Sequence, residues 1–315
     1  MERPGLAVLA IGGNALIRDR EHESIPDQYE MVCGIAEVIC GMLEGGWKVV
    51  VTHGNGPQVG FILRRSEIAI AEVPPVPMDY AGADIQGGVG YMFIKALRNA
   101  FRSRGMRREA VAVITLTVVD RDDPAFANPT KPIGSHMEEA RAKKLAAKYR
   151  WTVRDDAGRG WRRVVPSPRP QRILETAQIG QLAKEGHVVV CCGGGGIPVI
   201  EEENGDLKGV EAVIDKDLAS SLLARSMGAD TLVLPTGVEK VALDFNKPTQ
   251  RWLDSMTLAE AKRHHAENQF DAGSMGPKVA ALIDFVGGGG RLGLITNPQN
   301  VARALRGETG TRIVV

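Results

Sequence analysis

Three lysines of this chain stand where their charge could neutralise a phosphoryl group. Lys131 lies in PTKPIG, Lys216 lies in VIDKDLAS, and Lys278 opens an apolar helical stretch in GSMGPKVAALI. Phosphoryl transfer requires positive charge around the oxygens of the moving group. Lys216 lies between Asp215 and Asp217, either of which could orient the lysines or help to hold Mg²⁺. Taken singly, however, each lysine is more often an ordinary surface residue.

Three glycine-rich loops each follow an apolar run that is typical of a buried strand. In an open α/β sheet, ligands lie beyond the carboxyl ends of the strands. Glycines there let backbone N–H groups approach an anion, and the next helix adds the positive end of its dipole. The pattern predicts anion binding, although glycines that serve only helix–strand packing are the alternative. The loops are Gly12-Gly13-Asn14, Gly54-Asn55-Gly56 and Gly193–Gly196.

Several sequence signatures of other enzyme classes are missing from the places where they would have to stand. In VVVTHGNGPQVG the third glycine comes one residue too late for the dinucleotide fingerprint G-x-G-x-x-G. The chain also lacks the P-loop motif, the H-R-D loop of protein kinases, G-x-S-x-G and H-E-x-x-H. The six histidines show no metal-ligand spacing. His53 could act in catalysis from its loop position, or it could serve a structural hydrogen bond.

The bulk composition excludes several classes of partner. There are 39 Lys and Arg residues against 38 Asp and Glu, which does not favour a nucleic-acid or membrane surface. A hydrophobic content of 43% is ordinary for a soluble globular protein. The apolar run near the N-terminus is too short for a membrane span and lacks the layout of a signal peptide, so we expect a cytoplasmic protein. The four cysteines form no C-x-x-C pair and fit buried thiols better than zinc ligands or a disulfide.

Apolar strands alternate with helical stretches along almost the whole chain. The apolar runs are continuous, as in strands that are buried on both faces. This alternation predicts an α/β fold in which 1–315 forms one domain, with a mostly parallel sheet between layers of helices. Strands are expected at 6–12, 47–54, 110–119, 187–194, 231–237 and 291–297.

Residues 121–169 interrupt this alternation. They carry 12 Lys or Arg against 6 Asp or Glu and are rich in turn-forming residues. The segment contains three large aromatic residues that could form a small core, namely Phe126, Trp151 and Trp161. We therefore interpret it as an inserted, protruding subdomain rather than a linker. A cationic flap beside a phosphate site is the functional hypothesis. The alternative is that this segment is only a solvent-exposed insertion with no role in the activity.

Several of these stretches together resemble the carbamate kinase branch of the amino acid kinase family. The similarity spans nearly the whole chain, and DAGRGWRRVVPSP at 156–168 discriminates most strongly against sister branches. The other matching stretches are AIGGNAL (10–16), VTHGNGPQVG (51–60), NPTKPIG (128–134), CCGGGGIPVI (191–200), VEAVIDKDLAS (210–220) and GSMGPKV (273–279).

This resemblance implies a fold, a partner and a reaction. The implied fold is a three-layer αβα sandwich around a mostly parallel sheet of about eight strands, with a small protruding subdomain. The implied protein is a homodimer that interconverts ATP and carbamate with ADP and carbamoyl phosphate, using Mg²⁺. Carbamate is already an anion at neutral pH, so a site of glycine loops and lysines suffices without a general base.

The resemblance also assigns roles to particular residues. Lys131, Lys216 and Lys278 would neutralise charge on the transferred phosphoryl group, and Asp217 would organise the lysines. Carbamate and the phosphoryl group would be held by Gly12, Gly13, Asn14, Gly54, Asn55 and Gly56. The nucleotide would lie over the C-terminal half, and no protein side chain is assigned to Mg²⁺. The candidate nucleotide contacts are Gly194, Gly195, Asp215, Thr236, Phe245 and Met275.

Two other functions remain open. The chain could transfer a phosphoryl group to another small carboxylate or phosphate acceptor, as acetylglutamate and uridylate kinases do on this fold. A larger acceptor would need a guanidinium or other side-chain clamp near Gly54, and none is evident in THGNGPQVG. Alternatively, a nucleotide sensor would bind nucleotide and regulate a partner without turnover.

Overall fold

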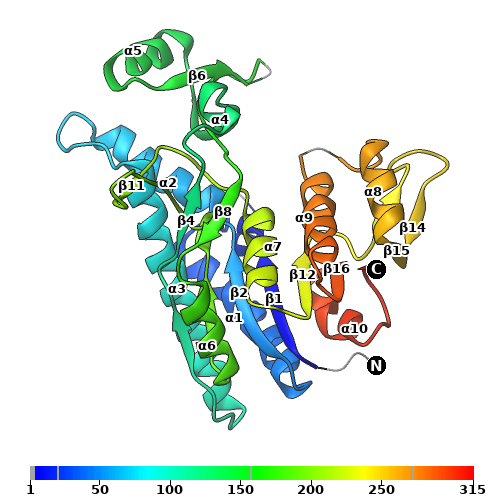
Figure 1. The fold of residues 1–315 in the computed structure, drawn as a ribbon. Helices are drawn as coiled ribbons and strands as arrows, with labels where there is room; N and C mark the ends of the chain where they lie inside the picture. Colours follow the sequence, from blue (N-terminus) through cyan, green and yellow to red (C-terminus); the bar gives the residue numbers. More distant parts are fainter. Residues whose placement is uncertain (1–3, 20, 157, 272) are drawn as a thin grey trace.

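A large, mostly parallel sheet forms the centre of the molecule (Figure 1). The computed structural model describes residues 4–19, 21–156, 158–271 and 273–315, without the side chain of Asn14, and within these residues the sheet has eight strands. Their order is β15 (Ser255–Thr257), β17 (Thr311–Val314), β16 (Leu292–Thr296), β12 (Thr231–Pro235), β1 (Leu6–Ile11), β2 (Lys48–His53), β9 (Val188–Cys191) and β3 (Ala110–Ala112). β17 runs antiparallel to β16, and the other ladders are parallel.

The central strands are buried on both faces, as their continuous apolar sequences predict. Side chains alternate along a strand. In β1, Ala7, Leu9 and Ile11 therefore enter one core, whereas Val8 and Ala10 enter the other. Two cores on opposite faces of one sheet require a covering of helices on each side.

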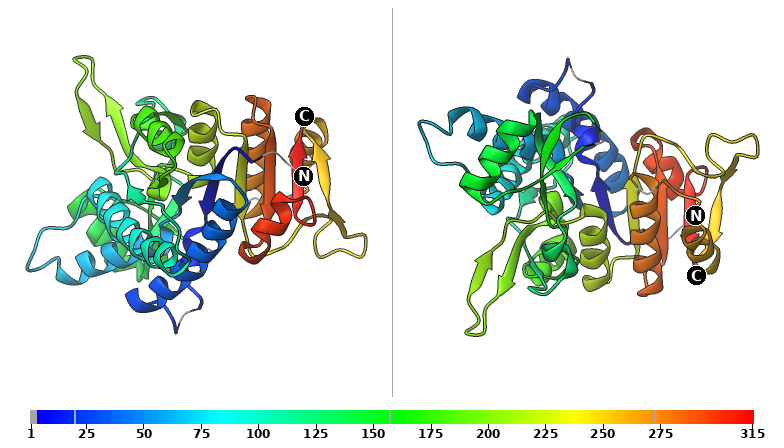
Figure 2. Two further views of the ribbon diagram at one scale, coloured as in Figure 1. Left: turned by 90° about the horizontal axis from the view of Figure 1, so that it is seen from below. Right: turned by 90° about the horizontal axis from the view of Figure 1, so that it is seen from above.

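Helices cover both faces and complete the predicted three-layer αβα sandwich, which is confirmed. One face is covered by α1 (Ile25–Glu44), α3 (Met78–Ser103) and α10 (Val301–Leu305). The other face is covered by α6 (Thr176–Lys184), α7 (Lys216–Ser226), α8 (Leu258–Ala266) and α9 (Met275–Gly287). Figure 2 shows that the elements after α7 gather at the side of the molecule opposite α2 (Gly56–Ala69).

Two of these helices begin at capping boxes that are visible in the sequence. At the start of α1, the Asp27 N–H donates to Ser24 Oγ (3.3 Å) and the Ser24 N–H donates to Asp27 Oδ2 (3.1 Å). Thr257 and Glu260 make the equivalent pair at the start of α8. Each box satisfies N–H groups that have no partner within the helix.

The prediction of one strand over 110–119 is wrong. β3 ends at Ala112, and the chain then crosses into a second sheet. At the crossing, the Thr115 N–H donates to Gln86 Oε1 (2.8 Å) and Gln86 Nε2 donates to the Thr115 carbonyl (3.1 Å). A side chain of α3 thus bonds the backbone of Thr115 at the crossing, while the Thr115 carbonyl also accepts from the N–H of Ile197 in the second sheet (2.8 Å). The second sheet has the order β11 (Leu207–Gly209), β10 (Ile197–Glu201), β4 (Leu116–Val119) and β8 (Pro170–Ile173).

Between β4 and β8 the chain leaves the body of the molecule, and we call residues 121–169 the protruding segment. Figure 1 shows α5 and β6 at its far end, away from the central sheet. Trp151 stacks on Tyr149 with ring centroids 5.4 Å apart, and Lys143 Nζ lies 5.6 Å from the ring of Trp161. Its elements are α4 (Pro124–Ala127), β5 (Lys131–Met137), α5 (Glu139–Tyr149), β6 (Thr152–Asp155) and β7 (Trp161–Val165).

The remaining elements are short. They are η1 (Gly13–Leu16), η2 (Gly193–Gly195), η3 (Pro298–Asn300), and a hairpin of β13 (Val241–Leu243) and β14 (Arg251–Leu253). Cys40, Cys191 and Cys192 are buried and Cys33 is half-buried, in agreement with their interpretation as structural thiols. No helix in the described part of the chain is long and apolar enough to cross a membrane.

Candidate active site

The carboxyl ends of β1, β2 and β9 lie side by side, and each leads into one of the three glycine loops. A β-carbon added to Gly54 would lie 2.5 Å from the backbone nitrogen of Gly13, and one added to Gly194 would lie 2.0 Å from Nδ2 of Asn55. The Gly54 N–H also donates to the carbonyl of Ile11 (2.8 Å). The three loops therefore form one continuous surface that is mostly main chain.

The third loop has a backbone that requires glycine. Gly194, Gly195 and Gly196 have φ angles of 68°, 91° and 94°, a region in which side chains are strained. A β-carbon on Gly195 would lie 2.8 Å from Cβ of Ile214. The loop thus packs directly on the segment that leads into α7.

The other loop residues predicted to bind substrate lie at the same edge of the sheet. Gly12 follows β1 directly, and Gly56 is the exposed first residue of α2. Asn14 lies in η1, and its side chain is outside the described part of the structure. The side chain of Asn55, the N-cap residue of α2, makes no capping hydrogen bond within the described structure. Pro57 has no N–H, so the N–H groups of the first turn that an anion could bond are those of Gly56 and Gln58.

Gly54→Ala is expected to lower turnover by about a hundredfold, because its β-carbon would displace the main chain of Gly13 and misplace the loop by about an ångström. The matched control is Gly60→Ala on α2, since a β-carbon at Gly60 meets no atom within 4 Å and the residue is not among the predicted substrate contacts. Turnover should be measured on both purified variants after their thermal unfolding has been compared with wild type. Equal losses of turnover in the two variants would contradict the importance of the loop contact.

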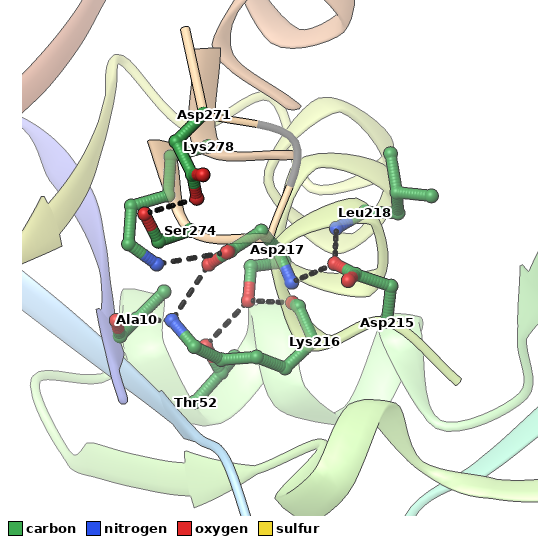
Figure 3. A network of polar contacts seen from close by, with 10 residues as sticks. Ala10, Thr52, Asp215, Lys216, Asp217, Leu218, Asp271, Ser274 and Lys278 are labelled. Carbon is green, nitrogen blue, oxygen red and sulfur yellow. Dashed lines mark hydrogen bonds and ion pairs between the residues drawn. The ribbon is translucent and has the colours of Figure 1, made fainter. Parts of the chain in front are cut away.

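The start of α7 is fixed by Asp215. This residue is the N-cap, and its Oδ1 accepts hydrogen bonds from the N–H groups of Asp217 (2.9 Å) and Leu218 (3.3 Å), as Figure 3 shows. A carboxylate at this point satisfies free N–H groups and is stabilised by the helix dipole. Asp215 therefore positions the two residues that follow it, while its contact with nucleotide stays a prediction.

Asp217 holds two of the predicted lysines (Figure 3). Lys216 Nζ lies 2.6 Å from Asp217 Oδ1 and also donates to the carbonyl of Ala10 (2.9 Å). Lys278 Nζ lies 3.0 Å from Asp217 Oδ2. These residues come from the first turns of α7 and α9, and the Ala10 carbonyl comes from the end of β1. We call them the Lys216–Asp217–Lys278 cluster.

The cluster is largely buried, with 7% of the Asp217 side chain and 13% of each lysine side chain exposed. Burial lowers the pKa of the Lys216 ammonium, and Lys278 acts in the same direction, while Asp217 opposes both. Burial alone would raise the pKa of Asp217, but the two lysines outweigh it and hold that pKa below its ordinary value. The cluster itself has one carboxylate and two ammonium groups, so its own charge is positive and suits an anionic ligand. The nearby Asp215 carboxylate also acts on Lys216 and favours its protonated form.

Two hydroxyl groups link the backbone of Lys216 to β2. Thr52 Oγ1 and Ser220 Oγ are 2.6 Å apart, and Ser220 Oγ donates to the carbonyl of Lys216 (2.6 Å). Both hydroxyls are buried. This link between β2 and α7 was not predicted from the sequence, where the two residues are 168 positions apart.

The start of α9 is shaped by a turn that leads to Lys278. The Ser274 hydroxyl donates to Asp271 Oδ1 (2.8 Å), and the Gly276 N–H donates to the carbonyl of Asp271 (2.7 Å). Met275, a predicted nucleotide contact, is the half-buried first residue of this helix. Met275 and Lys278 thus share the first turn of α9.

Lys131 stands apart from the other two lysines. It is exposed at the first residue of β5, and no hydrogen bond or ion pair in the described structure joins it to the cluster. The base of the protruding segment is nevertheless anchored, because Ile133 and Val165 pack with Val59 and Leu63 of α2 in a small apolar core. The strand that carries Lys131 is therefore fixed to the body at its root.

The remaining predicted nucleotide contacts are spread over the C-terminal half. Thr236 follows β12, and its N–H donates to the carbonyl of Thr296 (2.8 Å). Phe245 lies in the turn of the β13–β14 hairpin, is 52% exposed, and meets Trp252 edge to face with centroids 6.4 Å apart. These contacts stay predictions.

His53 is the buried last residue of β2, directly before the second loop, rather than an exposed acid or base. Its Nδ1–H donates to the carbonyl of Gly54 (3.0 Å), and its ring stacks on Phe93. Burial lowers its pKa to about 4, so the ring is neutral at pH 7. Of the two roles considered from the sequence, the structure favours the structural hydrogen bond.

The buried His53 predicts a component of stability that depends on pH. Its pKa is about 4 in the folded state against 6.5 in the unfolded state, so the unfolded state binds more protons as the pH falls. This component is complete above pH 6.5 and is lost as the pH falls toward 4, with about 2 kcal/mol lost by pH 5. Urea unfolding of wild type and His53→Gln at pH 7.5 and pH 5 measures it. The difference between the two proteins should shrink at pH 5, and an unchanged difference would contradict a buried neutral histidine.

The chain belongs to the amino acid kinase family, whose model matches residues 5–297. It is 47% identical to the carbamate kinase of Pyrococcus horikoshii over 98% of this chain and 99% of that protein. A carbamate kinase-like protein of Escherichia coli is also 47% identical, over 98% of each chain.

The structure agrees with this assignment. The carbamate kinase of Giardia lamblia bound to AMP-PNP superposes with a TM-score of 0.94 at 42% identity, covering 100% of this chain and 99% of that chain. Both the family resemblance and the α/β fold predicted from the sequence are thus confirmed.

Proposed function

We propose that this chain is an ATP:carbamate phosphotransferase, which catalyses the reversible reaction of ADP and carbamoyl phosphate to ATP and carbamate. The observation that carries the proposal is the buried Lys216–Asp217–Lys278 cluster beside three contiguous glycine loops. Carbamate kinases 43–47% identical over nearly the full chain support the choice of acceptor.

The chemistry needs charge and position rather than a proton acceptor. In the direction of ATP synthesis, a β-phosphate oxygen of ADP forms a bond to phosphorus while the bond from phosphorus to the carbamate oxygen breaks. Both the attacking and the leaving oxygen are anionic, so no general base is required. Lys216 and Lys278 stabilise the charge on the oxygens of the moving group, and Asp217 fixes the direction of both ammonium groups.

The glycine loops bind the small acceptor and the phosphoryl group through main-chain N–H groups. Lys131 completes the positive charge from the protruding segment, which we regard as a subdomain inserted at 121–169 in a single domain. ATP or ADP lies over the C-terminal half, in contact with the residues predicted above.

Mg²⁺ enters as part of the nucleotide substrate and neutralises phosphate oxygens. The donor set supports this view, because both Asp217 oxygens are engaged by lysines and no group of three His, Cys, Asp or Glu side chains within the described residues could hold a metal ion. When bound, Mg²⁺ would be held by substrate phosphates and water, with one or two protein carboxylates at most.

We also propose a cytoplasmic homodimer without nucleic-acid or membrane partners. Support for self-association comes from large apolar side chains exposed on α1 and α3, namely Ile25, Tyr80 and Tyr91. Ile25 also lines a hollow of about 320 Å³ between α1, α2 and α3. Light scattering at micromolar concentration measures the molar mass, and a monomer would contradict the proposal.

The deciding experiment is ATP formation from ADP, Mg²⁺ and carbamoyl phosphate in a coupled assay, with acetyl phosphate as the control donor. We expect rapid ATP formation with carbamoyl phosphate alone. Formation with acetyl phosphate instead would indicate another small acceptor. ADP binding without ATP formation from either donor would indicate a nucleotide sensor.

A further inference from the structure

Arg163 lies where the protruding segment joins the body of the molecule. Only 10% of its side chain is exposed, and it forms an ion pair with Glu211 of the segment before α7. Its guanidinium carbon also lies 4.6 Å from the ring centroid of Trp151. Glu211 in turn accepts a hydrogen bond from the N–H of Met78, the first residue of α3 (3.1 Å). One buried guanidinium thus connects the protruding segment with two parts of the body.

On the side of the protruding segment, Arg163 is close in register to Lys131. β5 and β7 are antiparallel, with Ile133 opposite Arg163 and Lys131 opposite Val165. Backbone hydrogen bonds hold the two strands at a fixed spacing. A displacement of β7 at Arg163 therefore displaces Lys131 as well.

On the side of the body, Glu211 is close to the buried cluster. It lies four residues before Asp215, the residue that caps α7 and precedes Lys216. Between them, the Val213 N–H donates to the carbonyl of Pro166 (3.0 Å), so the segment runs beside the end of β7. The Arg163–Glu211 ion pair therefore joins the two stretches of chain that carry Lys131 and Lys216.

We propose that Arg163, through Glu211, is a positioning residue that sets Lys131 relative to the Lys216–Asp217–Lys278 cluster; the proposal rests on the function proposed above. The apolar core at the root holds β5 and β7 against α2 without fixing their direction, because apolar contacts are not directional. A planar guanidinium between a carboxylate and an indole ring does fix direction.

The test uses Arg163→Met and, as a milder variant, Glu211→Gln. Glu211→Gln removes the charge of a half-exposed side chain and keeps an acceptor for the Met78 N–H, so it remains usable where Arg163→Met does not fold. The control is Arg162→Met, since Arg162 is the next residue on β7 and pairs with Asp156 inside the protruding segment (3.5 Å).

We expect Arg163→Met to lower kcat about tenfold to fiftyfold, because misplacement by about an ångström reaches this range, with ADP affinity within about twofold of wild type. Arg162→Met should leave both quantities within about twofold. In a Lys131→Ala background the effect of Arg163→Met should nearly vanish, since the residue acts through that lysine. Losses that multiply in the double variant would overturn the proposal, and so would a loss confined to ADP affinity.

Amide hydrogen exchange separates this proposal from the proposed reaction. Arg163→Met and Glu211→Gln should both accelerate exchange in peptides covering 129–135 and 209–215, whereas Arg162→Met should accelerate neither. Faster exchange in one peptide alone would contradict the coupling. If wild type makes no ATP from carbamoyl phosphate, the reaction assignment fails, while the exchange result still decides whether Arg163 couples the two stretches.

Discussion

Asp217→Asn is expected to lower kcat by about a thousandfold. The reason is that Asp217 holds Lys216 and Lys278 at 2.6 and 3.0 Å in a largely buried site. Loss of one charge-stabilising donor typically costs a hundredfold to a thousandfold in kcat, and this substitution misplaces two. Two buried ammonium groups without their carboxylate also repel each other and become easier to deprotonate.

The pH profile gives a second readout of Asp217→Asn. Asp217 raises the pKa of Lys216 against the lowering caused by burial, so its removal should lower that pKa further. Because the protonated lysine is the active form, the alkaline limb of the kcat profile should move to lower pH. The matched control is Asp284→Asn, since Asp284 bridges α7 and α9 through Ser221 and Arg225 instead of the lysines. If Asp284→Asn lost as much activity as Asp217→Asn, the effect would be due to the packing of α7 against α9 and not to the lysines.

Lys131→Ala is expected to lower kcat by about two to three orders of magnitude while ADP affinity changes by less than about threefold. Lys131 is exposed and makes no contact with the cluster in the described structure, so its charge is not part of the resting site. A contact made mainly with the moving phosphoryl group lowers the barrier without strengthening ground-state binding.

Steady-state kinetics combined with calorimetric titration of ADP separate the two quantities for Lys131→Ala. The control is Lys143→Ala, which removes another cation of the protruding segment, one paired with Glu139 on α5. It should retain kcat within about threefold. Loss of ADP affinity in proportion to turnover would contradict the role given to Lys131, and a similar loss of turnover in Lys143→Ala would indicate a general effect of charge.

The fold could be predicted well where strands are buried on both faces. Runs such as Leu6–Ile11 and Val49–Val51 are apolar throughout, and a parallel sheet between helices is the arrangement that buries them. The same signal failed at 110–119, because the run stays mostly apolar, with only Thr115 and Thr117 polar, across a crossing between two sheets. That crossing is fixed by Gln86, whose side chain bonds the backbone of Thr115 across 29 residues of sequence. A hydrogen bond between residues so far apart leaves no signal in the local sequence pattern.

The candidate site also has a part that could be predicted from the sequence and a part that could not. Its glycines and lysines carry chemistry in their residue types, so they could be selected from one sequence. The partners that position them, such as Ser220 beneath Lys216 and Glu211 beside Arg163, are common polar residues whose meaning comes from contacts over long separations. For Asp215, the residue type suggested that the carboxylate binds a lysine or a metal ion. Its role as the N-cap of α7 was seen only in the structure.

The contact of the three glycine loops has a consequence for substrate selectivity. A pocket lined by side chains can be enlarged by replacing one of them with a smaller residue. Gly13, Gly54 and Gly194 have no side chain, so no smaller residue can replace them. Their chains already approach so closely that an added β-carbon would lie 2.0–3.1 Å from a neighbouring loop. A bulkier acceptor would therefore require a shift of main chain in several loops at once. Point substitution at these glycines can narrow the range of acceptors, whereas widening it calls for insertion or deletion in the loops.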